Sequence, residues 1–533
     1  MKTLYFNGKV YTGNLPLAEA FIVEDDRFVF VGSSQEAKAW KTDQSIDLHG
    51  CFVCPGFNDS HMHLTSYGLA LRRAKLNEHT DSLSHMLDYF CQFAKENPPA
   101  AGGWLVGRGW NHDYFSDVSR MPDRYDLDQV STEYPVAAVR CCGHCMVINS
   151  KALEILGITA DTPQPDGGSI GIADGIPDGR FYDNAMDLVY RAFPDSTLPE
   201  IKDMIRAAAR SLNSFGVTSC HSDDYGMPWK LVNQAYKELE MDGELTVRVY
   251  EQSNFNSVEA LREFIALGNT TGAGTDFFRI GPLKMLGDGS LGSRTAYLSI
   301  PYADDPSTCG LPVFSQELLD QMIMTAHENG MQIAVHAIGD ACLDRVLSAY
   351  EKALKKYPRE DHRHGIVHCQ ITRPDQLKRM AEMKLHIYAQ SIFLDYDSAI
   401  VRDRVGDEMA ESSYNWKTLM ESGLCVSNGT DCPVELPIAL RGIQCAVTRS
   451  PLNGSLPPYL PRQAFTVQEA LDSYTSAGAR GSFEEDVKGR IQPGMLADFT
   501  VLGENIFETN PDNIASIPVL QTYVGGKLVY NAK

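Results

Sequence analysis

The most constraining feature of this 533-residue chain is a repeated alternation between helix-forming segments and short apolar runs. From about Ile201 onward, Gly216, Gly330 and Gly423 stand where a glycine is expected to end a helix, directly before the next apolar run. The pairs are EIKDMIRAAARSLNSFG with VTSCHS, SQELLDQMIMTAHENG with MQIAVHAIGD, PDQLKRMAEMK with LHIYAQSIF, and YNWKTLMESG with LCVSNGTD. This alternation is typical of βα units arranged around a parallel sheet.

Counting the apolar runs predicts how many strands the sheet contains. The first run ends at Asn58 to His63, and the later ones end near His221, Glu251, Lys284, His336, His368, Gln390 and Asp431. Eight parallel strands with intervening helices predict a (β/α)₈ barrel of the TIM type, whose active site lies at the carboxyl ends of the strands.

Two parts of the chain fall outside this pattern. Residues 1–56 and 482–533 contain short alternating segments closed by Gly, Asn or Asp, so we expect the two ends to pair into one β domain. The segment of about 65–199 is too long for one βα crossover, and it is predicted to be an insertion after the first barrel strand. The barrel itself is expected to span 57–481.

Composition and charge exclude several classes of protein. Apolar residues make up 43% of the chain and no apolar run reaches the ~18 residues that a transmembrane helix needs. The net charge of −22 disfavours nucleic acids and anionic membrane surfaces as partners. The N-terminus lacks the apolar run of a signal peptide, and the thirteen cysteines show no disulfide framework, so we expect a cytoplasmic protein.

The first apolar run ends in the sequence PGFNDSHMHL, which contains His61 and His63. Residues i and i+2 of a strand point to the same face, so both imidazoles can reach one metal ion. His336 and His368 are the first strongly polar residues after two other runs, and Asp431 follows the eighth. Singly, each histidine could be a core residue and Asp431 could cap a helix, but together the five side chains indicate a metal site.

Lys284 lies within an apolar run, IGPLKMLGDG, where a charged ammonium is costly to bury. A neutral lysine can add carbon dioxide to form a carbamate, an anionic oxygen ligand able to bridge two metals. The alternative is a lysine that forms an ion pair with Asp288 or Asp431.

This order of residues resembles the amidohydrolase superfamily: HxH after the first strand, Lys after the fourth, His after the fifth and sixth, and Asp after the eighth. The strings PDGGSIG, LKMLGDGSLGSRTAYL, AVHAIGDACLDRVL, NGTDCPVE and IQPGMLADFTVL are similar to the YtcJ-like branch (amidohydrolase family 3), which includes N-substituted formamide deformylase. The resemblance spans nearly the whole chain.

The resemblance implies a composite β-sandwich domain from the two terminal segments and a site for one or two divalent metal ions, most often zinc. The implied ligands are His61, His63 and Asp431 at one metal, His336 and His368 at the other, and a carboxylated Lys284 between them. In the insertion, RCCGHCMVINSKAL resembles a family string, which implies that Arg140 and His144 approach the substrate. Trp110 is a further candidate for the wall of the substrate cavity, and a homodimer is expected from family habit.

Two positions depart from the family pattern. Val367 replaces an acidic residue that often precedes the histidine after strand six, and Gln390-Ser391 replaces a common Gln-Pro pair. Because both positions are expected near the pocket, no substrate carries over from a characterised relative. His221, at the end of the second run, is interpreted as a packing residue.

These features predict a metal-dependent hydrolase that cleaves an amide-type C–N bond, N-formyl or N-acyl, of a small molecule. Asp431 is expected to take a proton from the attacking water and deliver it to the leaving nitrogen. The alternatives are a mononuclear deaminase of a small heterocycle, and a non-catalytic metal-binding scaffold that keeps the barrel.

Overall fold

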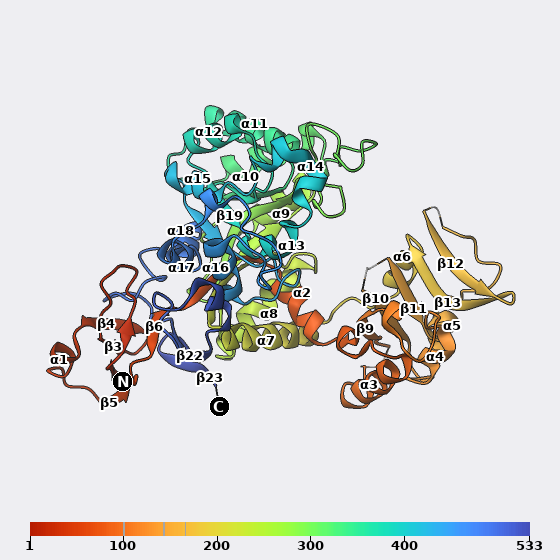
Figure 1. Cartoon of the computed structure of the whole chain (residues 1–533), viewed down its shortest axis with the longest axis horizontal. Coiled ribbons are helices and arrows are strands. Elements are labelled where there is room, and N and C mark those ends of the chain that lie inside the picture. The colour runs from red at the N-terminus through yellow and green to blue at the C-terminus, as the bar shows by residue number, and fades with distance from the viewer. Residues whose placement is uncertain (100–101, 142–143, 166, 533) are drawn as a thin grey trace. The chain divides into compact units, whose positions relative to one another are not determined.

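The computed structural model describes residues 1–99, 102–141, 144–165 and 167–532 (Figure 1). The chain divides into two compact units, the first formed by residues 1–68 with 198–533 and the second by residues 69–197. Each unit has its own sheets and its own apolar core.

The first unit contains an eight-stranded parallel sheet with the order β20-β19-β18-β17-β16-β15-β14-β7. Its strands are β7 (Phe57–Met62), β14 (Val217–Ser222), β15 (Arg248–Asn254), β16 (Phe278–Leu286), β17 (Ile333–Ala337), β18 (Gly365–His368), β19 (His386–Ala389) and β20 (Val426–Asn428). Most of their residues are buried, as expected for a sheet covered on both faces. The predicted eight-stranded TIM-type barrel is confirmed.

The sheet closes between β20 and β7. The Asp431 N–H donates to the His61 carbonyl at 2.8 Å, and the Thr430 N–H donates to Asp59 Oδ1 at 3.0 Å. Gly429 leaves room for this approach, since a Cβ there would lie 2.5 Å from the His61 nitrogen. The first and last strands, far apart in the sequence, therefore bring their ends together.

Helices connect the barrel strands on the outside, and α10, α11 and α12 follow one another along it (Figure 1). Gly216, Gly330 and Gly423 have φ values of 82°, 78° and 88°, the left-handed conformation predicted for residues that follow a helix. From residue 198 onward, the α-helices of this unit are α7 (Leu198–Ser214), α8 (Trp229–Met241), α9 (Val258–Ala266), α10 (Gln316–Glu328), α11 (Asp340–Lys356), α12 (Pro374–Glu382), α13 (Leu394–Asp397), α14 (Val401–Ala410), α15 (Trp416–Glu421), α16 (Ala439–Thr448), α17 (Val467–Ser473) and α18 (Ser476–Gly481).

The two ends of the chain meet in a pair of smaller sheets. One has the order β4-β3-β1-β5 and the other the order β2-β6-β21-β22-β23. Their strands are β1 (Lys2–Phe6), β2 (Lys9–Val10), β3 (Ala20–Glu24), β4 (Arg27–Gly32), β5 (Gln44–Asp47), β6 (Phe52–Pro55), β21 (Phe499–Leu502), β22 (Val519–Val524) and β23 (Lys527–Asn531). One aromatic core joins both sheets, with Tyr5 stacked on Phe21 and Phe499 stacked on Tyr523.

The second unit, residues 69–197, is built on a six-stranded sheet with the order β12-β13-β11-β10-β9-β8. Its elements include β8 (Ala74–Lys75), α3 (Leu83–Glu96), β9 (Leu105–Trp110), α4 (Arg124–Asp128), β10 (Val136–Arg140), β11 (Cys145–Ile148), α5 (Ser150–Leu156), β12 (Gly168–Ala173), β13 (Ile176–Asp183) and α6 (Met186–Tyr190). Two apolar clusters form its core. No helix in the described part of the chain is long and apolar enough to cross a membrane.

Candidate functional site

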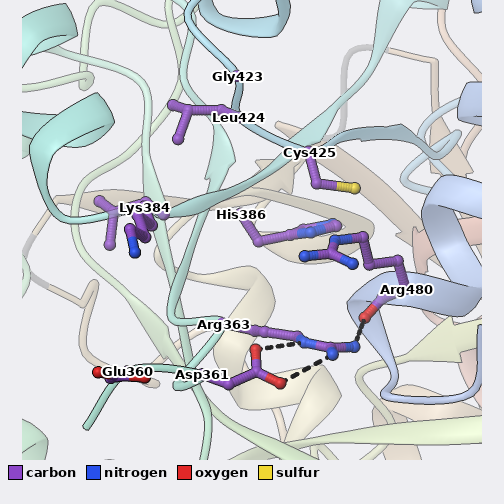
Figure 2. Close-up of a pocket in the computed structure, with 10 residues that line it drawn as sticks. Glu360, Asp361, Arg363, Lys384, His386, Gly423, Leu424, Cys425 and Arg480 are labelled. Carbon is purple, nitrogen blue, oxygen red and sulfur yellow. Dashed lines mark hydrogen bonds and ion pairs between the residues drawn. The ribbon is translucent and has the colours of Figure 1, made fainter.

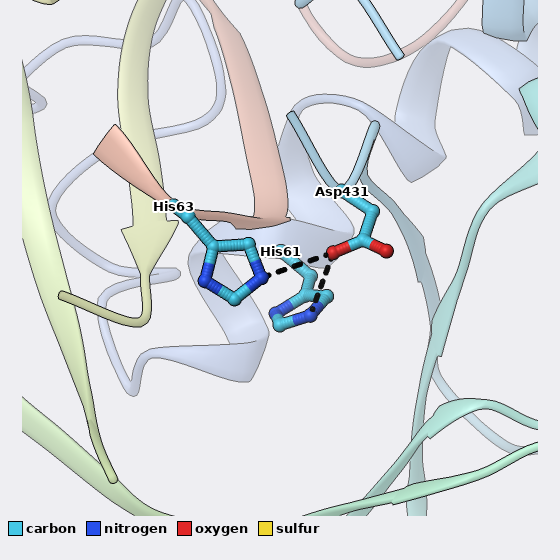
Figure 3. A group of neighbouring side chains, drawn as sticks. All are labelled: His61, His63 and Asp431. Carbon is cyan, nitrogen blue, oxygen red and sulfur yellow. Dashed lines mark hydrogen bonds and ion pairs between the residues drawn. The ribbon is translucent and has the colours of Figure 1, made fainter. Parts of the chain in front are cut away.

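Three side chains converge where β7 and β20 end. His61 belongs to β7 and His63 follows it by one residue, while Asp431 lies three residues beyond β20. The Nε2 atoms of His61 and His63 lie 3.3 Å and 3.2 Å from the same carboxylate oxygen, Asp431 Oδ1 (Figure 3). One ligand atom from each residue lies within 4.8 Å of the others, the spacing of a group that can bind one metal ion.

The Nδ1 atom of each of these histidines lies within hydrogen-bond distance of an acceptor. His61 Nδ1 lies 2.6 Å from Gln252 Oε1, and Gln252 Nε2 donates to the Ser60 carbonyl, which identifies the amide oxygen. His63 Nδ1 lies 2.9 Å from the Asp223 carbonyl. Since both partners can only accept, Nδ1 of each ring carries a proton, so that in the neutral imidazole Nε2 presents its lone pair, an arrangement typical of metal-binding histidines.

A second pair of histidines lies beside the first. The rings of His336 and His368 are 4.3 Å apart, and the His368 ring lies 5.7 Å from that of His61. His368 Nδ1 contacts Gln390 Oε1 at 2.8 Å, which leaves Nε2 as the donor atom, whereas His336 Nε2 contacts the Gly289 carbonyl at 3.0 Å, which leaves Nδ1. Four imidazoles therefore gather at the carboxyl ends of β7, β17 and β18.

Lys284 is buried within β16, with 1% of its side chain exposed. Its Nζ lies 3.4 Å from Asp223 Oδ2, so its carboxylate partner is neither Asp288 nor Asp431, the two partners considered from the sequence. Asp288 instead accepts the backbone N–H groups of Ile338 and Gly339, which follow β17.

Burial and charge act in opposite directions within the cluster. Burial lowers the pKa of His61 to about 4 and holds the pKa of His368 well below its usual range. Burial also lowers the pKa of His63, but its hydrogen bond to Asp431 and the nearby Asp223 outweigh this and raise the pKa to about 9. Burial opposes ionisation of Asp431, yet its contacts with both histidines hold its pKa well below the ordinary value.

These shifts describe an Asp431 carboxylate that lies between a protonated His63 and a neutral His61. A divalent cation at the same position would replace the proton on His63 and satisfy the same charge balance. The donor set of nitrogen and carboxylate oxygen therefore fits a first-row divalent metal.

The backbone at the two strand ends is held in an uncommon conformation. His368 and Asp431 have φ values of 72° and 56°, in the left-handed region that non-glycine residues seldom occupy. Asp59 stabilises the second of these turns by accepting hydrogen bonds from the Thr430 hydroxyl and N–H. Such strain is typical of functional sites that the surrounding structure over-determines.

The three residues predicted to approach the substrate all lie in the unit of residues 69–197. Trp110 is fully buried and its Nε1 donates to the Ala138 carbonyl at 3.0 Å. Arg140 donates to Asn111 and Asp113, and His144, 78% exposed at its side chain, lies 3.0 Å from Asp183. Their role in substrate binding stays a prediction.

Two polar residues around the cluster were not predicted from the sequence. Gln252 and Asp223 follow apolar stretches in VYEQSN and SCHSDD, the same kind of position that singled out the histidines. His221, in contrast, is enclosed in the barrel next to Tyr250 and Tyr388, as a packing residue would be.

A cavity of about 590 Å³ lies at the opposite, amino ends of β18, β19 and β20 (Figure 2). Within it, the Arg363 guanidinium donates to the Asp361 carboxylate and to the Arg480 backbone carbonyl. Because the His/Asp cluster lies at the carboxyl ends, this larger cavity is not the candidate reaction site.

Comparison with known proteins gives consistent results. Residues 44–530 match the family described as "Amidohydrolase family". The chain is 34% identical over 545 residues to the protein YtcJ of Bacillus subtilis (strain 168), named as an amidohydrolase, with 99% of each chain covered. It is 24% identical to N-substituted formamide deformylase of Arthrobacter pascens, covering 96% of this chain and 95% of that one. An uncharacterized metal-dependent hydrolase from Pyrococcus furiosus superposes with a TM-score of 0.79 at 28% identity, over 95% of this chain and 100% of that one.

Proposed function

The chain belongs to the amidohydrolase family and is a hydrolase, and on this premise we propose that it cleaves an amide-type C–N bond, N-formyl or N-acyl, of a small molecule with the aid of divalent metal. The observation that carries the proposal is the convergence of four imidazoles, a carboxylate and a buried lysine at the carboxyl ends of the barrel strands. The metal-dependent hydrolase of similar fold and the deformylase relative support it.

The proposed ligands fall into two groups. His61, His63 and Asp431 would hold one metal, and His336 and His368 the other. When bound, divalent metals supply a nucleophilic water at neutral pH and a Lewis acid for the carbonyl oxygen. Mixed imidazole and carboxylate ligands suit zinc as well as manganese, iron and nickel, and we propose zinc.

Asp431 is the proposed proton carrier. Both histidines contact this carboxylate at Oδ1 rather than at Oδ2. The carboxylate would accept a proton from the attacking water and return it to the nitrogen of the breaking C–N bond, which otherwise would leave as a strongly basic anion.

Lys284 is the proposed bridging group. As a neutral amine it would add carbon dioxide, forming one N–C bond and releasing one proton from Nζ, and Asp223 at 3.4 Å is placed to accept that proton. The product is an anionic carbamate. The same contact also supports the alternative, a mononuclear enzyme in which Lys284 remains an ammonium paired with Asp223.

Domain boundaries, cellular location and oligomeric state are also part of the proposal. We propose a composite β domain of residues 1–56 with 482–533 and a barrel domain of 57–481. A cytoplasmic location and a homodimer stay predictions.

The test is turnover by the Asp431→Asn variant, assayed on a panel of amides, N-formyl amines, N-acyl amino acids and cyclic ureides. We expect hydrolysis by the wild-type protein and a loss of at least about a hundredfold in the variant, because the amide cannot carry the proton. Asp403→Asn, on the exposed side of α14, is the matched control. Full activity of Asp431→Asn would overturn the assignment.

A further inference from the structure

A second, smaller cavity of about 220 Å³ adjoins the candidate metal site. Its lining comes from loops that follow the barrel strands and includes Leu291, Ile338, Gln370, Phe393, Asp397 and Glu435. Active-site pockets of barrel enzymes are built from these loops.

Two contacts connect this cavity to the proposed metal ligands. The Phe393 ring stacks on the His368 ring at 5.9 Å with an interplanar angle of 15°. On the other side, the Val434 N–H donates to the Asp431 carbonyl at 2.9 Å. A group held in the cavity would therefore be part of a molecule whose reacting bond lies at the cluster.

The lining combines apolar surface with negative charge. Leu291, Ile338 and Phe393 supply the apolar part, while Asp397 and Glu435 supply two carboxylates. None of the described residues that line the cavity is basic. The guanidinium of Arg441, a nearby positive group, is engaged with Asp395 at 3.3 Å.

Gln370 provides an acceptor that the protein does not satisfy. Only 1% of the residue is exposed, and its Nε2 donates to Asp397 Oδ2 at 3.2 Å, which fixes the orientation of the amide. Its Oε1 is buried and has no hydrogen-bond partner among the described residues. Leaving a buried acceptor unpaired is unfavourable, and a hydrogen bond from a ligand N–H would remove this cost.

Asp397 is likewise oriented for a ligand. Its Oδ2 accepts from both Gln370 and the Tyr414 hydroxyl, the latter at 2.8 Å, which leaves Oδ1 for a further donor. Burial raises the pKa of Asp397 to about 6 and also raises that of Glu435, so a cation nearby would relieve an unfavourable charge.

We propose that this cavity recognises a protonated amine on a short apolar or aromatic stem, so that the substrates are amides that carry an ammonium group. The N–H donors would bind Gln370 Oε1 and the two carboxylates, and the stem would lie against Phe393 and Tyr396, where a cation–π contact adds affinity. This inference rests on the proposed function, since it names the substrate class of the same site.

Binding is tested first, without catalysis. Full-length protein treated with a chelator is titrated calorimetrically at neutral pH with 2-phenylethylamine and with 2-phenylethanol, which share a stem and differ in charge. We expect the amine to bind at least about fivefold more tightly, a difference of about 1 kcal/mol. Equal affinity for the two probes would overturn the inference.

Amino-acid substitutions test which residues cause the preference for the amine over the alcohol. Glu435→Gln, at a partly exposed position, removes one charge without emptying the core, and should abolish most of the preference for the amine. Glu317→Gln, at the exposed start of α10, removes a charge elsewhere and should leave the preference unchanged. Gln370→Met removes the buried acceptor and should weaken binding of both probes. An unchanged ratio in Glu435→Gln would contradict the assignment.

Turnover separates this inference from the function on which it rests. With metal-loaded enzyme, kcat/KM is compared for N-acetyl-1,4-diaminobutane and N-pentylacetamide, in which a methyl group replaces the ammonium. A preference for the charged amide that Glu435→Gln removes supports the inference. Hydrolysis of both at equal rates overturns it and leaves the hydrolase assignment standing, whereas selective amine binding with no hydrolysis of any amide contradicts the hydrolase assignment alone.

Discussion

Gln252 lies outside the proposed ligand set but contacts one of its members, His61. It contacts His61 Nδ1 at 2.6 Å and thereby determines which imidazole nitrogen faces Asp431. The two residues are 191 positions apart in the sequence, and β7 and β15 bring them together only in the folded barrel.

We predict that Gln252→Leu weakens metal binding by about 10- to 100-fold, because the His61 ring loses the acceptor that fixes its tautomer and orientation. Metal affinity is measured by competition with a chromophoric chelator. Gln234→Leu, on the exposed face of α8, is the matched control and should bind metal like the wild type. An affinity of Gln252→Leu equal to that of the control would show that this contact is dispensable.

The sequence singles out the candidate ligands because each is a polar residue within or close after an apolar strand. It does not single out the residues that orient them. In the sequence, Gln390 is distinguished only by its departure from a family pattern. The side chains of Gln252 and Asp223 could equally form hydrogen bonds with water or with the backbone. Both carboxylate partners predicted for Lys284 were wrong, since its partner Asp223 follows β14, two strands away from β16 in the sheet, and only the folded barrel brings the two side chains together.

At the scale of elements, the seam between β20 and β7 determines whether the cluster forms. The Asp431 N–H donates a hydrogen bond to the His61 carbonyl, and Asp59 stabilises the adjoining turn by accepting a hydrogen bond from the Thr430 N–H. A change at the seam should therefore affect stability and metal binding together.

Gly429→Ala tests this coupling. The new Cβ would lie 2.5 Å from the His61 nitrogen, a distance that forces the strands apart. We expect a loss of stability of about 1–3 kcal/mol, typical of overpacking, together with a fall in bound metal. Thermal unfolding and metal analysis are the measurements. Gly226→Ala, where an added Cβ meets nothing within 4 Å, should change neither, and a Gly429→Ala protein of normal stability and metal content would contradict the coupling.

Element type and order were largely predictable from sequence. Each of the eight apolar runs became a barrel strand, and the glycines at 216, 330 and 423 follow helices as expected. The six-stranded sheet of residues 69–197 was not foreseen, because its strands pair across a segment with little regular alternation, and its short β8 of two residues gives no periodic signal.

At the scale of the whole molecule, several histidines are buried in their neutral form. Burial lowers the pKa of His386 to about 3 and that of His362 to about 4, and it holds the pKa values of His221 and His364 well below the usual range. In the unfolded chain these groups return to about 6.5.

These low pKa values make the folding stability of the protein depend on pH. Because the folded pKa lies below the unfolded one, the unfolded chain binds more protons, and stability that is complete above about pH 6.5 is lost as the pH falls toward 3 to 4. Each such group contributes up to about 1.4 kcal/mol per pH unit. We predict that His386→Asn reduces the fall in Tm of metal-free protein between about pH 7 and pH 5, whereas the exposed His49→Asn does not. An identical fall in all three proteins would contradict this account.

The family assignment predicted from the sequence is confirmed, and it concerns the molecule as a whole, since the match covers residues 44–530. The proposed chemistry depends on the metal centre, whose proposed ligands come from β7 and the residue after it, from β16, β17 and β18, and from the turn after β20. Only a folded barrel assembles them.

The most direct test of the metal centre is the metal content per chain, measured by mass spectrometry on protein purified without chelators, beside Lys284→Ala. We predict about two divalent ions per wild-type chain and about one in the variant, because the lysine carbamate is the proposed bridge between them. Protein that folds normally and carries no divalent metal would contradict the proposed hydrolase mechanism, and one ion that the substitution leaves in place would contradict the bridge.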